Sequence, residues 1–167
     1  MADVLPPPDR PALLVICVDV CDPANLGGIL RNAAAFGADA VLLNDRCTDP
    51  FSRRVLRASM GATLKLPVAT VADIEQALRA LGRDYGVELV AAVVGENAEP
   101  LRTADRPSRL GLVIGNEGQG LDSRVVDCCG RSLAIPMQPD TDSLNAAVAS
   151  GVFLHHFVHS AGRQDLH

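Results

Sequence analysis

The sequence predicts a single α/β domain in which a mainly parallel sheet is flanked by helices. Its 167 residues, 48% of them hydrophobic, suit one domain with a substantial buried core. Short runs of Val, Ile and Leu recur, and continuous apolar runs of this length are typical of strands buried on both faces. Helical patterns lie between the runs. The predicted strands are residues 12–18, 40–43, 87–94, 110–114 and 132–135, with a weaker one at 64–68.

The first predicted helix spans residues 25–36. Its apolar residues from Leu26 to Ala33 recur at i, i+3, i+4 and i+7, which is the pattern of one buried helix face. Asn25 is a suitable N-cap, and Gly37 stands where the helix would end. We therefore expect this helix to lie on the sheet.

Two further helices are predicted downstream. Residues 71–85 repeat the amphipathic pattern, with Thr70 and Asp73 spaced as a capping box. Residues from 143 to about 161 are apolar on most sides, and residues 146–151 are mostly small. This last helix should pack closely against other protein, part of which can be a second subunit.

The ends and the cysteines bear on the cellular location. Residues 1–11 are too rich in proline to begin a helix or a central strand, so we expect a tail or the stump of a linker. The sequence has neither a secretory signal nor the roughly 18 consecutive apolar residues of a membrane span. The five cysteines form no CxxC pair, which favours reduced thiols over disulfides or zinc. We expect a cytoplasmic protein with no membrane partner.

The charge pattern bears on nucleic-acid binding. A net charge of −5 disfavours non-specific coating of nucleic acid, which needs many phosphate contacts from Lys and Arg. Tryptophan is absent and aromatic residues are few, which disfavours a platform for base stacking. Residues 45–65 are locally basic, and they form either a solvated helix face or a local grip on RNA. The basic residues are Arg46, Arg53, Arg54, Arg57 and Lys65, against Asp45 and Asp49.

Three loops that follow predicted strands are candidate ligand sites, because open α/β sheets bind ligands at the carboxyl ends of their strands. The first spans residues 22–38. Gly27 and Gly28 fall in the first helical turn, where each costs about 1 kcal/mol relative to Ala, so we expect something to approach that backbone. Arg31 lies off the apolar face and can donate to a phosphate or a developing oxyanion. The alternative is a surface arginine beside glycines that serve only helix packing.

The second loop, residues 112–121, has the sequence LVIGNEGQGL. Its three glycines allow backbone groups to line a ligand, although a simple tight turn would also explain them. The spacing GxxGxG differs from the dinucleotide fingerprint GxGxxG, which disfavours a nucleotide-dependent oxidoreductase. Glu117, between the glycines, is suited to anchor a neighbouring loop or a basic partner.

The third loop, residues 135–151, is stiffened by Pro136 and Pro139. Ser143 is a candidate cap for the last helix, and Asn145 would present an amide from its first turn.

Two pairs of side chains are of the types that bind metals. Asp140 and Asp142 have no His or Glu at ligand spacing and are interpreted as solvated loop residues. His155 and His159 are one helical turn apart, but the glutamate of HExxH is missing and no third ligand is evident. We therefore expect no metal.

In order, NLGGILRNAAAFGA, LVIGNEGQGL and IPMQPDTDSLNAAVASG resemble the three signature motifs of SpoU-type tRNA/rRNA ribose 2′-O-methyltransferases, members of the SPOUT superfamily. SRRVLRASMGA, residues 52–62, is similar to the segment after the second strand in that family. The resemblance covers about residues 12–161. It implies a SPOUT α/β-knot fold with a C-terminal trefoil knot, a homodimer, and a catalytic domain at residues 12–167.

The resemblance also implies an activity and a set of site residues. The activity is methyl transfer from S-adenosylmethionine (AdoMet) to a ribose 2′-hydroxyl of RNA, with no metal. Arg31 would stabilise the hydroxyl as it becomes alkoxide-like, since a guanidinium is a poor general base. The expected catalytic residues are Asn25, Arg31, Glu117, Ser143 and Asn145. The expected donor contacts are Val94, Gly95, Gly115, Ile135, Met137 and Leu144. The expected RNA contacts are Arg46, Arg53, Arg54 and Arg57.

Two questions stay open at the level of sequence. Ribosomal RNA is preferred over transfer RNA as the substrate, and a non-catalytic RNA-binding module that retains the fold is the alternative function. The intact set of motif residues speaks against that alternative. Many members of the family carry an N-terminal RNA-binding domain, so the chain is either a minimal enzyme or a catalytic domain.

Overall fold

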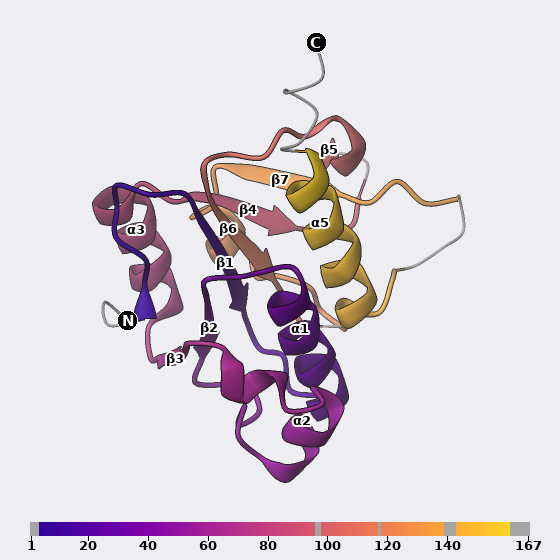
Figure 1. The fold of residues 1–167 in the computed structure, drawn as a ribbon. Helices are drawn as coiled ribbons and strands as arrows, with labels where there is room; N and C mark the ends of the chain where they lie inside the picture. Colours follow the sequence, from indigo (N-terminus) through magenta and orange to yellow (C-terminus); the bar gives the residue numbers. More distant parts are fainter. Residues whose placement is uncertain (1–3, 96–97, 117, 139–142, 161–167) are drawn as a thin grey trace.

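The computed structural model describes residues 4–95, 98–116, 118–138 and 143–160 (Figure 1). Its centre is a seven-stranded sheet in the order β3-β2-β1-β6-β4-β7-β5, and every neighbouring pair is parallel. The parallel sheet that the sequence predicts is therefore confirmed. The strands are β1 Ala12–Cys17, β2 Ala40–Asn44, β3 Val68–Val71, β4 Glu88–Ala92, β5 Glu99–Pro100, β6 Arg109–Ile114 and β7 Arg131–Ala134.

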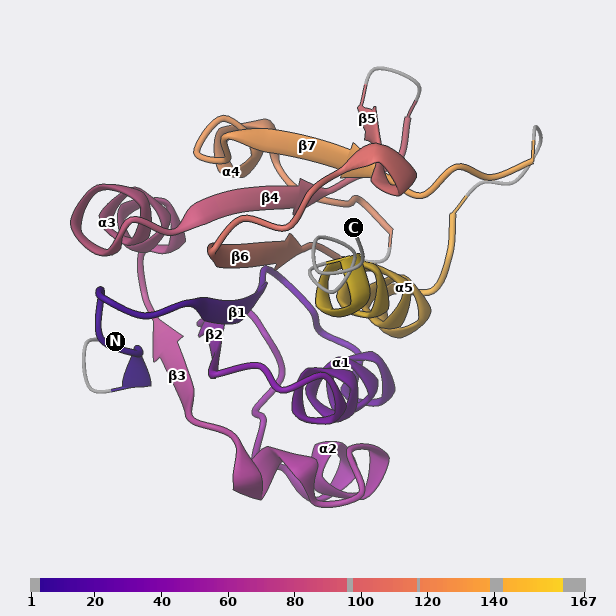
Figure 2. The ribbon, with the colours of Figure 1, turned by 45° about the horizontal axis from the view of Figure 1, so that its top comes forward.

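Helices cover both faces of the sheet (Figure 2). One face carries α1 (Pro23–Ala35), α2 (Arg53–Ala58) and α5 (Ala146–Ser160), and the other carries α3 (Ile74–Tyr85) and α4 (Ser123–Val126). Short 3-10 helices include η2 (Ala62–Lys65) and η3 (Leu101–Thr103).

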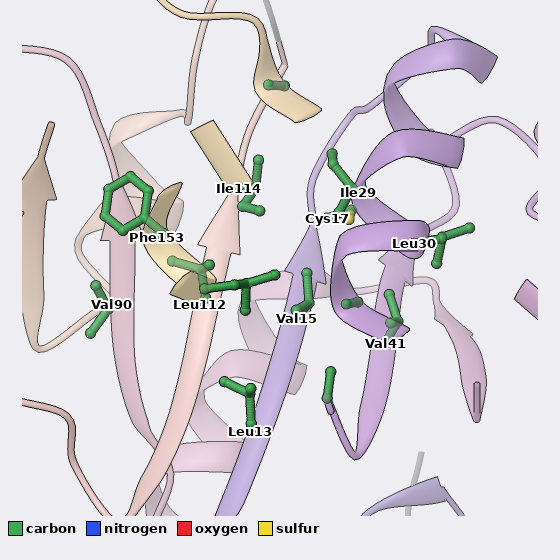
Figure 3. Close-up of a cluster of buried hydrophobic side chains, with 14 of the residues drawn as sticks. Leu13, Val15, Cys17, Ile29, Leu30, Val41, Val90, Leu112, Ile114 and Phe153 are labelled. Carbon is green, nitrogen blue, oxygen red and sulfur yellow. The ribbon is translucent and has the colours of Figure 1, made fainter. Parts of the chain in front are cut away.

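The apolar runs in the strands result from burial on both faces. Leu13 and Val15 of β1 pack in the cluster beneath α1 and α5, and Leu14 and Ile16 pack in the cluster beneath α3. Figure 3 shows the first cluster, in which Phe153 of α5 lies over the sheet. Because successive side chains of a strand point to opposite faces, a strand between two helix layers needs an unbroken apolar run.

Several predicted boundaries were wrong. α1 begins at Pro23, and its N-cap is Asp22 rather than Asn25: the carboxylate accepts from the backbone N–H groups of Ala24 and Asn25 at 2.7 and 3.0 Å. Proline at the first helical position already has a suitable φ and lacks an N–H that would need a partner. The helix therefore starts one turn earlier than its apolar pattern indicates.

The weak strand predicted at 64–68 was displaced. Residues 62–65 form η2, and β3 begins only at Val68. The helix predicted from residue 71 begins at Ile74, where Asp73 alone caps the N–H of Gln76, so the predicted capping box was wrong. Pairing with β2 involves Val68–Val71, so Val71 is a strand residue rather than the first residue of the helix.

The proline-rich N-terminal segment is attached to the domain from Val4 onward. Val4 and Leu5 pack against the cluster under α3. The buried Arg109 side chain donates to the backbone carbonyl oxygens of Pro7 at 2.8 Å and Pro6 at 3.3 Å, and also to that of Arg10. This part of the segment is therefore a packed strap rather than a free tail.

Candidate functional site

A concave site lies at the carboxyl ends of β4, β6 and β7. It is a cavity of about 490 Å³, a volume typical of small-molecule sites. Its lining residues come from four places: the ends of these three strands and the first two turns of α5. They include Ala92 at the end of β4 with Val93 and Val94 after it, Gly115, Asn116 and Gly118 to Leu121 after β6, Ile135 and Met137 after β7, and Ser143, Leu144, Ala146, Ala149 and Phe153 just before and within α5.

Most of the predicted donor contacts meet in this cavity. Five of the six line it: Val94, Gly115, Ile135, Met137 and Leu144. Gly95 directly follows Val94 but is not a lining residue, and its φ of +137° explains why glycine stands there. Two of the three predicted loops, residues 112–121 and 135–151, therefore meet at one site together with the segment after β4, whereas the loop at residues 22–38 does not line it.

The glycine loop after β6 closes one wall of the cavity. A Cβ atom on Gly115 would lie 2.6 Å from the carbonyl carbon of Gly120, so only glycine fits. Asn116 pairs with Gly120 across the turn, and its Oδ1 accepts from the N–H groups of Gly118 and Gln119 at 2.8 and 3.2 Å. The backbone of this loop is thus fixed from within.

Glu117 and the aspartates Asp140 and Asp142 lie outside the described residues. Their predicted roles therefore stay predictions. The trefoil knot also stays a prediction, because the chain path between β7 and α5 passes through residues 139–142.

α1 packs tightly against α5, and polar groups join the first and third motifs. Asn145 caps α5, since its Oδ1 accepts from the N–H groups of Ala147 and Val148 at 2.9 and 3.2 Å. The predicted cap, Ser143, lines the cavity instead. The Nδ2 of Asn145 donates to the Oδ1 of Asn25 at 2.7 Å, so the two predicted catalytic amides are in contact.

The glycines of α1 allow close approach on two sides. A Cβ on Gly28 would lie 2.6 Å from the Cβ of Ala147 in α5, and a Cβ on Gly27 would lie 2.4 Å from that of Ala58 in α2. Asn32 reinforces the first contact by donating to the carbonyl of Ala147 at 2.7 Å. The close approach predicted at this backbone is confirmed, and protein supplies it.

Arg31 is exposed and does not line the cavity. On a helix of about 3.6 residues per turn, Arg31 projects between the directions of Gly27, which faces α2, and Gly28, which faces α5. The α5 face that contacts α1 carries Ala147, whereas the face that lines the cavity carries Ala149, about 200° further around. Within one chain, the face of α5 that contacts α1 is therefore turned away from the face that lines the cavity.

The basic segment forms a second concave surface. Arg54 and Arg57 of α2 line a hollow of about 360 Å³ with Ala58 and residues 22–24 at the start of α1. Arg53 is exposed on the same short helix. Ser52 caps α2, and Val55 anchors it in the core. The predicted basic face is thus held rigidly against α1.

Arg46 stands apart from the other three arginines of the predicted RNA-binding set. It forms an ion pair with Asp19 at 2.7 Å, at the ends of β1 and β2. The sequence reasoning missed Asp19, Asn44 and Asn116, which together join these strand ends to the glycine loop. A signal was present, because each is a polar residue at or directly after a buried strand.

The cysteines and histidines show no metal arrangement. Among the residues that the structure describes, no group of three His, Cys, Asp or Glu side chains could hold a metal ion. Burial raises the pKa of Cys47 to about 11 and that of Cys129 to about 12, so both stay protonated at neutral pH. The ring of His155 contacts those of Phe36 and His159. None of the helices in the described ranges has the length and apolar content to span a bilayer.

Comparison with known proteins gives consistent matches. A relative from Mycobacterium sp. (strain KMS), named an uncharacterized tRNA/rRNA methyltransferase, is 40% identical over 147 residues, which are 86% of this chain and 45% of the relative. An AdoMet-bound rRNA methyltransferase from Sinorhizobium meliloti is 33% identical with a TM-score of 0.83, covering 97% of this chain and 60% of its own. An RNA 2′-O ribose methyltransferase is 27% identical with a TM-score of 0.82, covering 94% and 59%.

The chain spans about half the length of the curated relatives that it matches. Within that span, its parallel sheet and helix layers match those of the solved SpoU structures. Residues 12–155 match the SpoU rRNA Methylase family, which is most of the chain and includes all three motifs. On this evidence the chain belongs to the SpoU rRNA methylase family.

Proposed function

We propose that this chain is the catalytic part of an enzyme that transfers a methyl group from AdoMet to a ribose 2′-hydroxyl of RNA, with ribosomal RNA as the preferred substrate. One observation carries the proposal: the second and third motifs and the loop after β4 converge on a single cavity at the carboxyl edge of the sheet. The AdoMet-bound rRNA methyltransferase of Sinorhizobium meliloti supports the donor and the RNA class. The 2′-O ribose methyltransferase supports the acceptor atom.

The cavity suits AdoMet in size and in its lining. Its walls are mostly small and aliphatic side chains, together with a glycine loop and a few polar side chains such as Asn116 and Ser143. Such a site can hold an adenosine by apolar contact and by backbone hydrogen bonds. When bound, AdoMet supplies an electrophilic methyl group, and the chain's task is to position the acceptor and exclude water.

Arg31, Arg54 and Arg57 are proposed to hold the RNA. All three are exposed on the neighbouring helices α1 and α2, and guanidinium groups suit phosphate geometry. Arg31 would stabilise negative charge on the ribose oxygen as its proton leaves and the new C–O bond forms. Asn25 and Asn145 brace the start of α1 against α5 through their mutual hydrogen bond.

A homodimer is proposed because one chain does not bring Arg31 to its own cavity. An apolar stripe runs from Leu144, which lines the cavity, to Val148 and Val152 of α5, and these side chains are 36%, 53% and 39% exposed. Exposed valines on a helix are suited to cover a second copy of the same helix. A two-fold contact at this stripe would bring Arg31 of one copy toward the cavity of the other.

The test of the activity uses radiolabelled AdoMet and total RNA from cells that lack the gene. Methyl incorporation, followed by nuclease digestion and mass spectrometry, should yield 2′-O-methylated nucleosides from ribosomal RNA. Arg31→Ala should lower kcat by roughly 100-fold or more while AdoMet binding changes less than twofold. Binding of AdoMet without methyl transfer would instead favour a non-catalytic module.

The dimer is tested by mixing two inactive variants in one heterodimer, purified with two tags. One copy carries Arg31→Ala and the other carries Gly115→Ala in the cavity wall. If Arg31 acts on the partner's cavity, one intact site forms and about half of the wild-type activity per dimer returns. If Arg31 acts within its own chain, both sites carry a defect and the heterodimer stays inactive.

A further inference from the structure

Asp19 directly follows the buried end of β1 and has a backbone conformation that few residues other than glycine adopt. Its φ is +58°, in the left-handed region, where asparagine and aspartate are the best tolerated alternatives to glycine. A strained residue at the carboxyl edge of a sheet persists only when its surroundings hold it. The contacts of Asp19 identify what holds it.

Asn44, at the end of β2, clamps Asp19 from two directions. Its Oδ1 accepts from the backbone N–H of Asp19 at 2.9 Å, and its Nδ2 donates to the Asp19 carboxylate. Asn44 is only 3% exposed, so these bonds are shielded from water. The carboxylate is closed on its outer side by the ion pair with Arg46 at 2.7 Å.

Asp19 is hydrogen-bonded in turn to a residue that lines the cavity. The backbone carbonyl oxygen of Asp19 accepts from Nδ2 of Asn116 at 3.0 Å. Asn116 lines the cavity, and its Oδ1 holds the N–H groups of Gly118 and Gln119, which also line it. A continuous chain of hydrogen bonds therefore runs from Asn44 through Asp19 to the glycine loop.

We propose that Asp19 and Asn44 are positioning residues that set the shape of the glycine loop for donor binding, acting through Asn116. The inference rests on the proposed function of the cavity as the AdoMet site. Asp19 does not itself line the cavity, so loss of its side chain would loosen the loop without removing a cavity-lining group. Arg46, which was expected to bind RNA, instead holds the Asp19 carboxylate through their ion pair.

The test measures AdoMet binding by calorimetry together with KM for RNA at saturating AdoMet. Asp19→Ala removes the carboxylate that Asn44 and Arg46 hold and disfavours the positive φ that aims the Asp19 carbonyl at Asn116, so it should raise the Kd for AdoMet about tenfold, with the KM for RNA unchanged. Asp19→Asn tolerates the same φ and keeps an oxygen for Asn44, so it should rescue binding to within about threefold of wild type. Arg46→Gln should change the Kd for AdoMet, by about twofold, and leave the KM for RNA unchanged, because its ion pair is exposed.

Asp39→Ala is the matched control for loss of folding stability. Its carboxylate accepts from the backbone N–H of Leu13 at 2.8 Å, at the opposite end of β1 and away from the cavity. It should lower the melting temperature but leave the Kd for AdoMet within twofold of wild type. Equal Kd values for Asp19→Ala and Asp39→Ala would overturn the inference.

A double-mutant cycle tests the relay itself. Asp19→Ala and Asn116→Ala should weaken AdoMet binding by similar factors, and the double variant should be no worse than either single variant by more than about twofold. Additive losses would show that Asp19 does not act through Asn116 and would overturn the proposal. Failure of the wild-type protein to bind AdoMet would instead refute the proposed function of the cavity.

Discussion

The two sides of α1 are built on different principles. Toward α5 and the cavity, the contacts are made by glycine, alanine and backbone amides: Gly28 meets Ala147, and Asn32 donates to the Ala147 carbonyl. Toward solvent beside α2, the surface consists of exposed guanidinium groups such as Arg54 and Arg57. The α5 side depends on shape, whereas the α2 side combines the tight contact of Gly27 with Ala58 and a charged surface. Added bulk should damage the cavity side, and loss of charge should damage the α2 side.

The largest effect is expected from Gly115→Ala. The added Cβ would lie 2.6 and 2.7 Å from the carbonyl carbon and oxygen of Gly120, and backbone cannot yield as a flexible side chain does. The glycine loop must move, so AdoMet binding should weaken by roughly 100-fold, equivalent to about 3 kcal/mol. Isothermal titration calorimetry measures the Kd.

Gly82→Ala is the control for the same change elsewhere. Gly82 lies in α3, where the nearest atom to an added Cβ is the Val87 carbonyl oxygen at 3.9 Å. Alanine favours helix over glycine by about 1 kcal/mol, so this variant should be stabilised and bind AdoMet as the wild type does. Normal AdoMet binding by Gly115→Ala would show that the glycine loop does not form the donor site.

The adjacent pair Gly27 and Gly28 separates the two sides of α1 directly. Alanine at either position overpacks a helix contact, and each variant should lose roughly 1–3 kcal/mol of unfolding free energy. Gly28→Ala displaces α5, which lines the cavity, so it should raise the Kd for AdoMet severalfold. Gly27→Ala displaces α2 and should raise the KM for RNA instead. Identical kinetic profiles would contradict the division between the sides.

Loss of charge should affect only the RNA side. Replacing both Arg54 and Arg57 by glutamine should raise the KM for RNA about tenfold. It should also lower the slope of log KM against log salt concentration by the amount expected for the loss of about one to two phosphate contacts. AdoMet binding should stay unchanged. Arg102→Gln, an exposed arginine in η3, is the control and should alter neither constant. If the salt dependence of the KM for RNA is unchanged in the double variant, the RNA does not bind at Arg54 and Arg57.

Sequence patterns predicted the fold class because each pattern depends on local geometry. The buried strands and α1 and α5 follow directly from apolar runs and helical spacing. The cap at Asp22 was missed, although the Asp-Pro pair that carries it was visible, because the apolar stripe begins three residues later. The insertion of β6 between β1 and β4 is a long-range pairing, and no periodicity encodes it.

Sequence could place a site residue at the edge of the sheet when the residue lies in a loop directly after a strand. It could not show which loops contact each other. Gly115 and Ile135 could be placed at one edge of the sheet from sequence alone. The bond between Asp19 and Asn116 joins residues 97 apart, so only the folded sheet reveals it. The same holds for Arg31, whose distance from the cavity depends on how α5 lies across the end of the sheet.

The smallest expected effect concerns two thiols near Asp19, the half-buried Cys47 and the exposed Cys21. Burial raises the pKa of Cys47 to about 11 from 9.0, whereas Cys21 at the start of the same region is exposed. At pH 8, iodoacetamide should therefore alkylate Cys21 well before Cys47, as mass spectrometry of digested protein would show. Because the folded-state pKa lies above the unfolded value, the contribution of Cys47 to stability is present below pH 9 and falls as the pH rises to about 11. Cys47→Ala should remove this part of the alkaline decline in urea unfolding, and an unaltered decline would mean that the Cys47 thiol is open to solvent.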